Sequence, residues 1–136
     1  MVYWGPFSQY TMTDDIRFMP ETPEHPPRHE IIANANDMFR KLMHPMMGDV
    51  YVTPGVAALN EIDQRQLMML VQGFDVFTEN NDPYKEHDFG QIDFGGTRYF
   101  WKIDLLDRDT KSVYTPDPTN PNLTWRVLTI MEASEY

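Results

Sequence analysis

Four titratable side chains lie close together in one short segment and form the densest such group in the chain: Asp82, Glu86, His87 and Asp88. A histidine oriented by a carboxylate can act as a general base, and a histidine with acidic neighbours can hold a hard metal ion. A metal-assisted hydrolase that uses Glu86, His87 and Asp88 is therefore one hypothesis. Against it, successive side chains of a strand point to opposite faces, so these three cannot converge unless the backbone bends. The alternative is structural, with His87 or Asp88 capping a hairpin through backbone hydrogen bonds.

A second acidic group invites comparison with calcium-binding loops, because its aspartates alternate: Asp104, Asp107 and Asp109. The EF-hand loop needs an oxygen ligand at its third ligand position and a glycine at its sixth residue. Lys111 occupies that ligand position here, and no glycine follows it. We therefore expect solvated carboxylates and predict no metal site.

Several chemistries lack the residues that they require. The chain has no cysteine, which excludes disulfides, thiolate nucleophiles and cysteine-ligated zinc. Its serines lie in no nucleophile-elbow motif, it has no Gly-Lys-Ser or Gly-Lys-Thr phosphate loop, and its glycines make no dinucleotide fingerprint. We expect no cofactor and none of the common nucleotide-dependent or serine-hydrolase mechanisms.

The charge balance suggests a class of partner. The 136 residues include 21 acidic and 11 basic side chains, for a formal net charge of -10. Direct binding of nucleic acid is disfavoured, because it needs clustered Lys and Arg. An acidic surface could instead occupy the basic groove of a nucleic-acid-binding protein, although the same surplus could serve solubility alone. The carboxylates that we expect to bind such a protein partner are Asp93, Asp104, Asp107, Asp109 and Asp117.

The N-terminal residues show no targeting or membrane signal. The first six residues lack the basic and apolar regions of a signal peptide, and no stretch approaches the roughly 18 to 20 apolar residues of a membrane span. We expect a cytoplasmic protein without a membrane partner.

Residues 1–28 are predicted to form an extended arm. Five prolines interrupt any helical or strand period there: Pro6, Pro20, Pro23, Pro26 and Pro27. The arm also carries aromatic residues, whose exposure to water would be unfavourable. We expect it to pack on the domain of residues 29–136 or on a partner.

The first part of that domain reads as helix, strand and helix. Apolar residues recur on one face from His29 to His44: Ile31, Ile32, Ala35, Met38, Phe39, Leu42 and Met43. A short strand at residues 50–52 is predicted to end in a turn at residues 53–55. Asn60 is a good N-cap for a helix that we expect to run to about Phe77.

The clearest local signal is a hairpin. Two alternating stretches, residues 88–94 and 97–105, flank Gly95-Gly96, a two-residue turn. This turn places Phe94 opposite Thr97 and Gly90 opposite Trp101. The missing side chain of Gly90 would make room for the indole to lie across the strand.

The last element is predicted to be a helix that starts at Asn120 and Pro121, with residues 127–131 on its buried side. By propensity alone, residues 127–131 could instead be a strand. The elements together predict a small single α+β domain, in which three helices pack on a short antiparallel sheet with a central hairpin.

Several motifs occur in order along the chain: Asn36-Asp37 with Phe39-Arg40, Gly55 to Leu59, Phe74-Asp75 through Asn81-Asp82-Pro83, His87 to Gly90, Phe100 to Asp104, Asp117-Pro118, and Arg126 to Met131. In these motifs the chain resembles an uncharacterised bacterial family, a domain of unknown function with an HDFG motif. The similarity runs from about Ile31 to Tyr136, with Leu105-Leu106 where the family usually has aromatics. The resemblance implies no activity, but members of the family often look like accessory genes of plasmids, phages and other mobile elements.

Three functional hypotheses follow. The first is a non-enzymatic interaction protein of a mobile element, an inhibitor of a host defence or nucleic-acid-processing protein, of the anti-CRISPR or anti-restriction type. The second is the metal-assisted hydrolase described above. The third is an antitoxin-like regulatory subunit whose arm folds on its partner.

Overall fold

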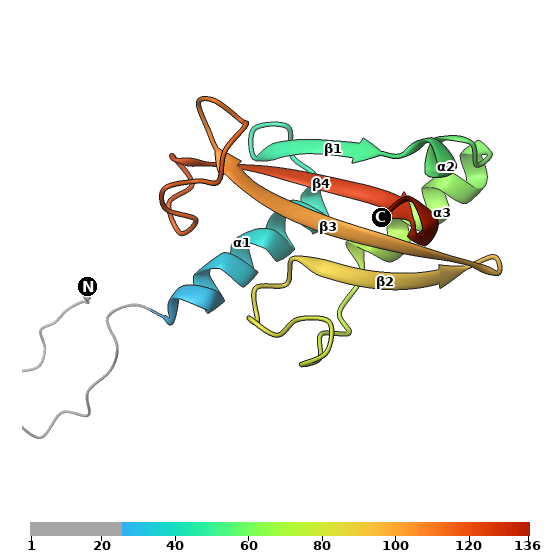
Figure 1. Cartoon of the computed structure of the whole chain (residues 1–136), viewed down its shortest axis with the longest axis horizontal. Helices are drawn as coiled ribbons and strands as arrows, with labels where there is room; N and C mark the ends of the chain where they lie inside the picture. The colour runs from blue at the N-terminus through green and yellow to red at the C-terminus, as the bar shows by residue number, and fades with distance from the viewer. Residues whose placement is uncertain (1–25) are drawn as a thin grey trace, which may run out of the picture.

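A computed structural model of the chain describes residues 26–136. The predicted arm therefore lies almost wholly outside the described residues. Figure 1 shows the elements in order: α1 (Arg28–Leu42), β1 (Gly48–Val52), α2 (Pro54–Ala57), α3 (Glu61–Gln72), β2 (Phe89–Phe94), β3 (Thr97–Asp107), β4 (Thr124–Glu132) and a final 3-10 helix (Ala133–Glu135). The domain is α+β, as predicted.

The four strands form one sheet in the order β1-β4-β3-β2. β2, β3 and β4 are antiparallel neighbours, but β1 pairs with β4 in parallel, with Gly48 beside Arg126 and Val52 beside Ile130. The prediction of a purely antiparallel sheet was therefore wrong. The sheet is mixed because the chain passes through two helices and a hairpin between β1 and β4 and re-enters the sheet in the same direction.

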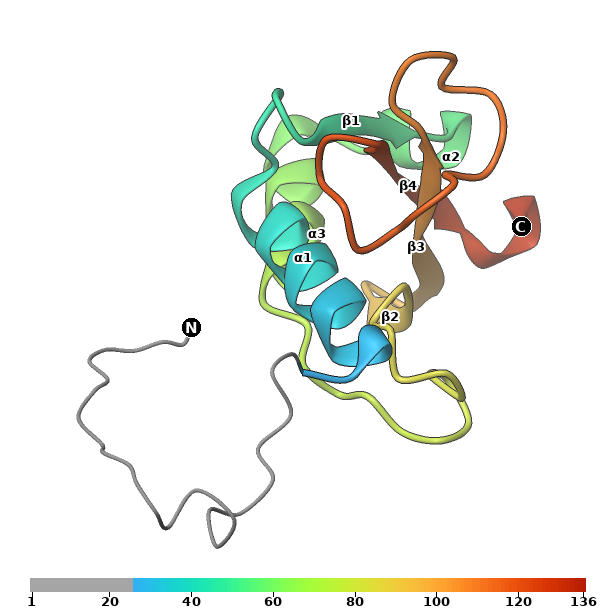
Figure 2. The same ribbon diagram turned by 90° about the vertical axis from the view of Figure 1, so that its left-hand side faces the viewer.

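α1 and α3 lie side by side on one face of the sheet (Figure 2). The core fills the space between these helices and the inward-facing residues of β3 and β4. Trp101 and Leu128 on the strands and Phe39 on α1 are all 0% exposed. The opposite face of the sheet is covered in part by an aromatic group of Phe89, Phe100 and Tyr136, with ring centroids 5.1 to 6.0 Å apart.

The predicted last helix is in fact β4, so that prediction was wrong. Asn120 caps a turn rather than a helix: its side-chain oxygen accepts from the N–H of Asn122, and its carbonyl accepts from Leu123. The residues that follow include Thr124, Trp125, Val127 and Ile130, whose branched or aromatic side chains suit a strand. Because β4 lies between β1 and β3, it forms backbone hydrogen bonds with a strand on each side. This pairing outweighs the helix-start signal at Asn120 and Pro121.

Two smaller predictions also need correction. The segment after β1 is a single helical turn, α2, with Pro54 at its first position. α3 begins after Asn60, whose side chain accepts from the N–H of Asp63 as a predicted N-cap should, but it ends at Gln72 instead of Phe77. Gly73 follows as the C-cap, so Phe74 and Phe77 belong to the loop between α3 and β2.

The hairpin has the predicted register, with Phe94 opposite Thr97 and Gly90 opposite Trp101. Gly95 and Gly96 have φ values of +60° and +82°, which glycine adopts without strain. A Cβ at Gly90 would overlap Nε1 of Trp101, so the indole occupies the space that a side chain would need. These glycines fix the hairpin and the position of the buried tryptophan.

Candidate functional site

Arg40 of α1 holds the loop between α3 and β2. Its side chain is 1% exposed and donates from Nε to the carbonyl of Val71 at 3.0 Å and from Nη2 to that of Phe74 at 2.8 Å. Nη1 donates to Oδ1 of Asp37 at 3.0 Å. The guanidinium also lies 4.9 Å from the Trp101 ring, whose Nε1 is buried and has no hydrogen-bond partner among the described residues. Through Arg40, α1 is thus hydrogen-bonded directly to the end of α3 and to the loop that follows α3.

Asn36, one turn before Arg40, ties α1 to two further segments. Its Nδ2 donates to the carbonyl of Glu86 at 2.9 Å, and its Oδ1 accepts from Nε of Arg126 on β4 at 2.8 Å. Asn36 is 0% exposed, and both ends of its amide are therefore satisfied inside the protein.

His87 lies at the end of this network, between two carboxylates. Its Nδ1 is 2.9 Å from Oδ2 and 3.0 Å from Oδ1 of Asp37, and its Nε2 is 3.7 Å from Oδ2 of Asp82. One face of its ring stacks on Phe77 with the centroids 3.8 Å apart and the planes at 5°. These contacts fix the position of the ring and turn Nε2 toward Asp82.

The loop is shaped by Asp82, which is 5% exposed. Its Oδ1 accepts from the N–H groups of Glu86 and His87 at 3.0 and 3.1 Å. Lys85 and His87 have φ values of 60° and 57°, a region that side-chain-bearing residues rarely adopt. The bend that lets His87 turn away from its neighbours is therefore held by an aspartate side chain.

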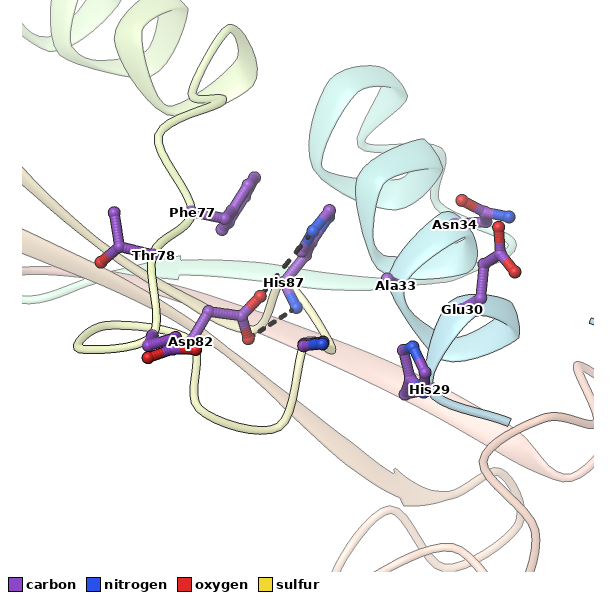
Figure 3. Close-up of a pocket in the computed structure, with 10 residues that line it drawn as sticks. His29, Glu30, Ala33, Asn34, Phe77, Thr78, Asp82 and His87 are labelled. Atoms are coloured by element: carbon purple, nitrogen blue, oxygen red, sulfur yellow. Dashed lines mark hydrogen bonds and ion pairs between the residues drawn. The ribbon is translucent and has the colours of Figure 1, made fainter. Parts of the chain in front are cut away.

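A cavity of about 680 Å³ lies between this loop and the first turns of α1 (Figure 3). Phe77, Asp82 and His87 form one wall, and residues of α1 form the other. The complete lining is His29, Glu30, Ala33, Asn34, Phe77, Thr78, Glu79, Asp82, Lys85 and His87. His87 lines this cavity with Nδ1 held by the carboxylate of Asp37, and a histidine oriented by a carboxylate can act as a general base.

The sequence-predicted cluster does not converge. Glu86 and Asp88 line a different and smaller depression of about 200 Å³ together with Asp104 and Tyr114, and His87 does not. Burial raises the pKa of Glu86 and of Asp88, and the charge of Asp88 raises that of Glu86 further. Within residues 26–136, no group of three or more His, Asp or Glu side chains has an arrangement that could hold a metal ion.

The five carboxylates predicted to bind a partner are dispersed. Asp93 pairs with Arg98 at 3.0 Å near the hairpin turn, and Asp104 pairs with Lys102 at 3.0 Å. Asp107 ends β3, nine positions beyond Arg98, which corresponds to roughly 30 Å along a strand.

The other three of these carboxylates lie in or beside the loop that joins β3 to β4. Asp107 accepts from the backbone N–H of Asp109 and of Thr110, and the side chain of Asp109 itself is exposed. The side chain of Asp117 accepts from the hydroxyl and N–H of Thr119, which lowers the pKa of Asp117. The length of β3 therefore separates Asp93 from Asp107, Asp109 and Asp117, and the five carboxylates do not form one patch.

Sequence reasoning missed the residues of α1 that organise the site, namely Asn36, Asp37 and Arg40. The apolar stripe predicted to face the core contains Met38 and Leu42, which are 54% and 65% exposed. A signal was present in the sequence, since polar residues at positions 36, 37 and 40 interrupt the apolar spacing and occur in motifs that resemble the HDFG family. Burial of a polar helix face needs partners that lie 31 to 90 residues away, which spacing alone does not identify.

Comparison with known families gives a match over most of the domain. Residues 52–135 match the family described as "Protein of unknown function (DUF3768)". The chain belongs to this family. Asp82 and His87 lie within the part that matches the DUF3768 family, and Asn36, Asp37 and Arg40 precede it. No curated protein and no solved structure matches the chain.

Within residues 26–136 no helix is both long and apolar enough to cross a bilayer.

Proposed function

We propose that this chain is a non-enzymatic interaction protein of a mobile element that binds a basic nucleic-acid-processing or defence protein of its host and inhibits it. The observation that carries the proposal is the imbalance of unpaired charge on the described part of the chain. Residues 26–136 contain 17 acidic side chains, and only five of them have a Lys, Arg or His nitrogen within 4.0 Å. The mobile-element origin rests on the family resemblance given above.

Residues 26–136 carry ten Lys and Arg side chains against 17 acidic ones. Two of these cations, Arg40 and Arg126, are buried, and Arg108 and Lys111 lie over the ring of Trp125 at 5.1 and 4.0 Å. The field that a partner meets is therefore negative. Such a field accelerates association with a basic groove and disfavours acidic competitors.

One depression brings three of these acidic side chains together: Glu86, Asp88 and Asp104. Burial raises the pKa of Glu86 and of Asp88, and the charge of Asp82 raises both further, which means that negative charge is incompletely compensated there. Tyr114, 61% exposed, and Leu106 border the same depression. A Lys or Arg side chain of a partner would relieve the repulsion and pack on the aromatic ring.

Function is tested in cells that carry a restriction or CRISPR system. Expression of the chain should increase the establishment of a targeted plasmid at least tenfold, and the variant Glu86→Gln with Asp88→Asn should lose most of that effect. Asp75→Asn with Glu79→Gln removes the same number of charges from exposed loop positions and is the matched control. Unchanged plasmid establishment across several defence systems, with no basic protein captured at low salt, would rule out the proposal.

A proton-transfer enzyme is a second candidate, and the Asp37–His87 pair beside the cavity is the observation that favours it. The hydrolase hypothesis drawn from the sequence required metal, whereas the geometry offers His87 as a general base that activates water for attack on an ester or amide. Hydrolysis of a panel of chromogenic esters should then resist EDTA and fall at least a hundredfold in His87→Gln. Equal rates in His87→Gln and wild type would exclude this role.

A further inference from the structure

Arg126 is a buried cation with no anionic partner among the described residues. It is 3% exposed, and the hydrogen bond of Nε to Asn36 is the one contact that its guanidinium makes with a polar side chain of residues 26–136. No carboxylate of these residues lies within 4.0 Å of it. Burial lowers its pKa to about 10. Burial of a charge without a counterion is strongly unfavourable, so an anion that reaches Arg126 would relieve this cost.

Two cavities meet at this guanidinium. One, of about 180 Å³, also contacts Arg108 and Asn122, and the other, of about 320 Å³, runs along α1. The two cavities adjoin, because three residues line both of them: Met47, Pro121 and Arg126. Figure 2 shows the loop before β4 passing beside α1. Most residues that line the larger cavity come from these two segments.

The larger cavity is apolar apart from Arg126 and two small polar side chains. Ile31, Ala35 and Met38 line it from one stripe of α1, and Met47 and Pro121 face them. Met38 is 54% exposed in this groove, although its helical spacing predicts a core position. An apolar groove that ends at an unpaired guanidinium is complementary to a molecule with an apolar body and one anionic end.

The charge at the site suits a monoanion. Arg126 is the one charged side chain in the lining of the larger cavity, and Arg108 lines the smaller one, where Nη2 donates to the carbonyl of Met46 at 2.9 Å and Nη1 to that of Thr124 at 3.4 Å. A single cation in the larger cavity favours a carboxylate over a phosphate, which would bring a larger and more strongly hydrated charge.

We propose that the groove between α1 and the loop before β4 binds a small carboxylic acid with an apolar chain, whose carboxylate pairs with Arg126 and whose chain packs on Ile31, Ala35 and Met38. The edge of the guanidinium that Asn36 does not occupy donates to the carboxylate. This site shares only Asn34 with the lining of the His87 cavity and no residue with the depression at Glu86, and it stands or falls independently of the proposed function.

Isothermal titration calorimetry of the full chain with sodium octanoate tests the proposal. We expect saturable binding at one site, and at least tenfold weaker binding of 1-octanol, which lacks the charge, and of inorganic phosphate, which lacks the chain. Octanoate that fails to bind, or that binds no better than 1-octanol, would overturn the assignment.

Variants locate the binding. Met38→Glu places a negative charge in the groove at an exposed helical position and should weaken octanoate binding at least tenfold. Met69→Glu makes the same change on α3, where Met69 is 63% exposed, and should leave binding unchanged. Arg126→Met should abolish binding, and circular dichroism reports whether that variant folds. If it does not fold, the comparison of Met38→Glu with Met69→Glu tests the site. Equal affinities in the two glutamate variants would refute the site.

Discussion

Nδ1 of His87 lies 2.9 Å from Oδ2 of Asp37, across a separation of 50 residues in the sequence. Asp37 accepts at the same time from Arg40, which is bonded to the carbonyls of Val71 and Phe74. The loop between α3 and β2 is therefore attached to α1 at both of its ends. The geometry of this loop depends on three side chains of α1: Asn36, Asp37 and Arg40.

Asp37→Asn tests this attachment. The variant keeps the volume but removes the charge that faces both His87 and Arg40, so we expect a loss of about 1 to 3 kcal/mol in the free energy of unfolding. Urea denaturation measures it, and hydrogen exchange should show the loop opening first. Asp93→Asn breaks an exposed pair and should cost less than about 0.5 kcal/mol. Similar losses in the two variants would contradict the role given to Asp37.

Gly90→Ala tests the fit of the hairpin around Trp101. The added Cβ would overlap Nε1 of Trp101 and meet Cζ of Phe74 at 2.8 Å, so we expect about 1 to 3 kcal/mol of destabilisation and a shifted tryptophan fluorescence maximum. Gly73→Ala is the control, because a Cβ there meets nothing closer than 3.4 Å. If Gly90→Ala is as stable as Gly73→Ala, the close approach to the indole is not a constraint.

Glu86→Gln with Asp88→Asn should stabilise the fold near neutral pH. Folding raises the pKa of both groups above their ordinary values of 4.5 and 3.8, so their ionised forms are less favourable in the folded than in the unfolded protein. The gain should be complete above the raised pKa values and should disappear as the pH falls to the ordinary ones. Unfolding free energies of variant and wild type from acid to neutral pH measure it; a gain that grows toward low pH would have the wrong sign.

Glu135→Gln should show the opposite pH dependence. The carboxylate of Glu135 accepts from the hydroxyl of Thr53 and the N–H groups of Gly55 and Glu132, which lowers its pKa below 4.5. Its contribution is present above the ordinary value and is lost as the pH falls through the lowered one. The variant should therefore be less stable than wild type near neutral pH and equal to it in strong acid. A difference that persists in strong acid would show that charge is not the cause.

Sequence patterns predict correctly those elements that are fixed by residues close together in the sequence. The hairpin follows from Gly95-Gly96 and the alternation on each side of it, and α3 begins where Asn60 predicts. The propensity of residues 127–131 also fits a strand, but the signals at Asn120 and Pro121 favour a helix, and in the structure these two residues belong to a turn. What decides β4 is pairing with β1, and Gly48 lies 78 positions from its partner Arg126.

The site was harder to predict because its partners are distant in sequence. The sequence predicts a cluster of His87 with its neighbours Glu86 and Asp88, but the bend at Lys85 and His87 turns His87 toward Asp37 and Asp82 instead. Arg126 occurs in a motif that assigns it no role, because the sequence of a strand does not indicate that a cation is buried. The arm and the choice of partner remain predictions.

β4 is the last strand in the sequence, and it lies between β1 and β3 in the sheet. During synthesis on the ribosome, β1 emerges long before the strand it pairs with, and it has no neighbour until β4 leaves the exit tunnel. Cotranslational folding can therefore complete the hairpin early, but the four-stranded sheet closes only after β4 has emerged. A stalled or clipped chain that ends before β4 would leave one edge of β1 and one edge of β3 unpaired, and unpaired strand edges make such fragments prone to aggregation.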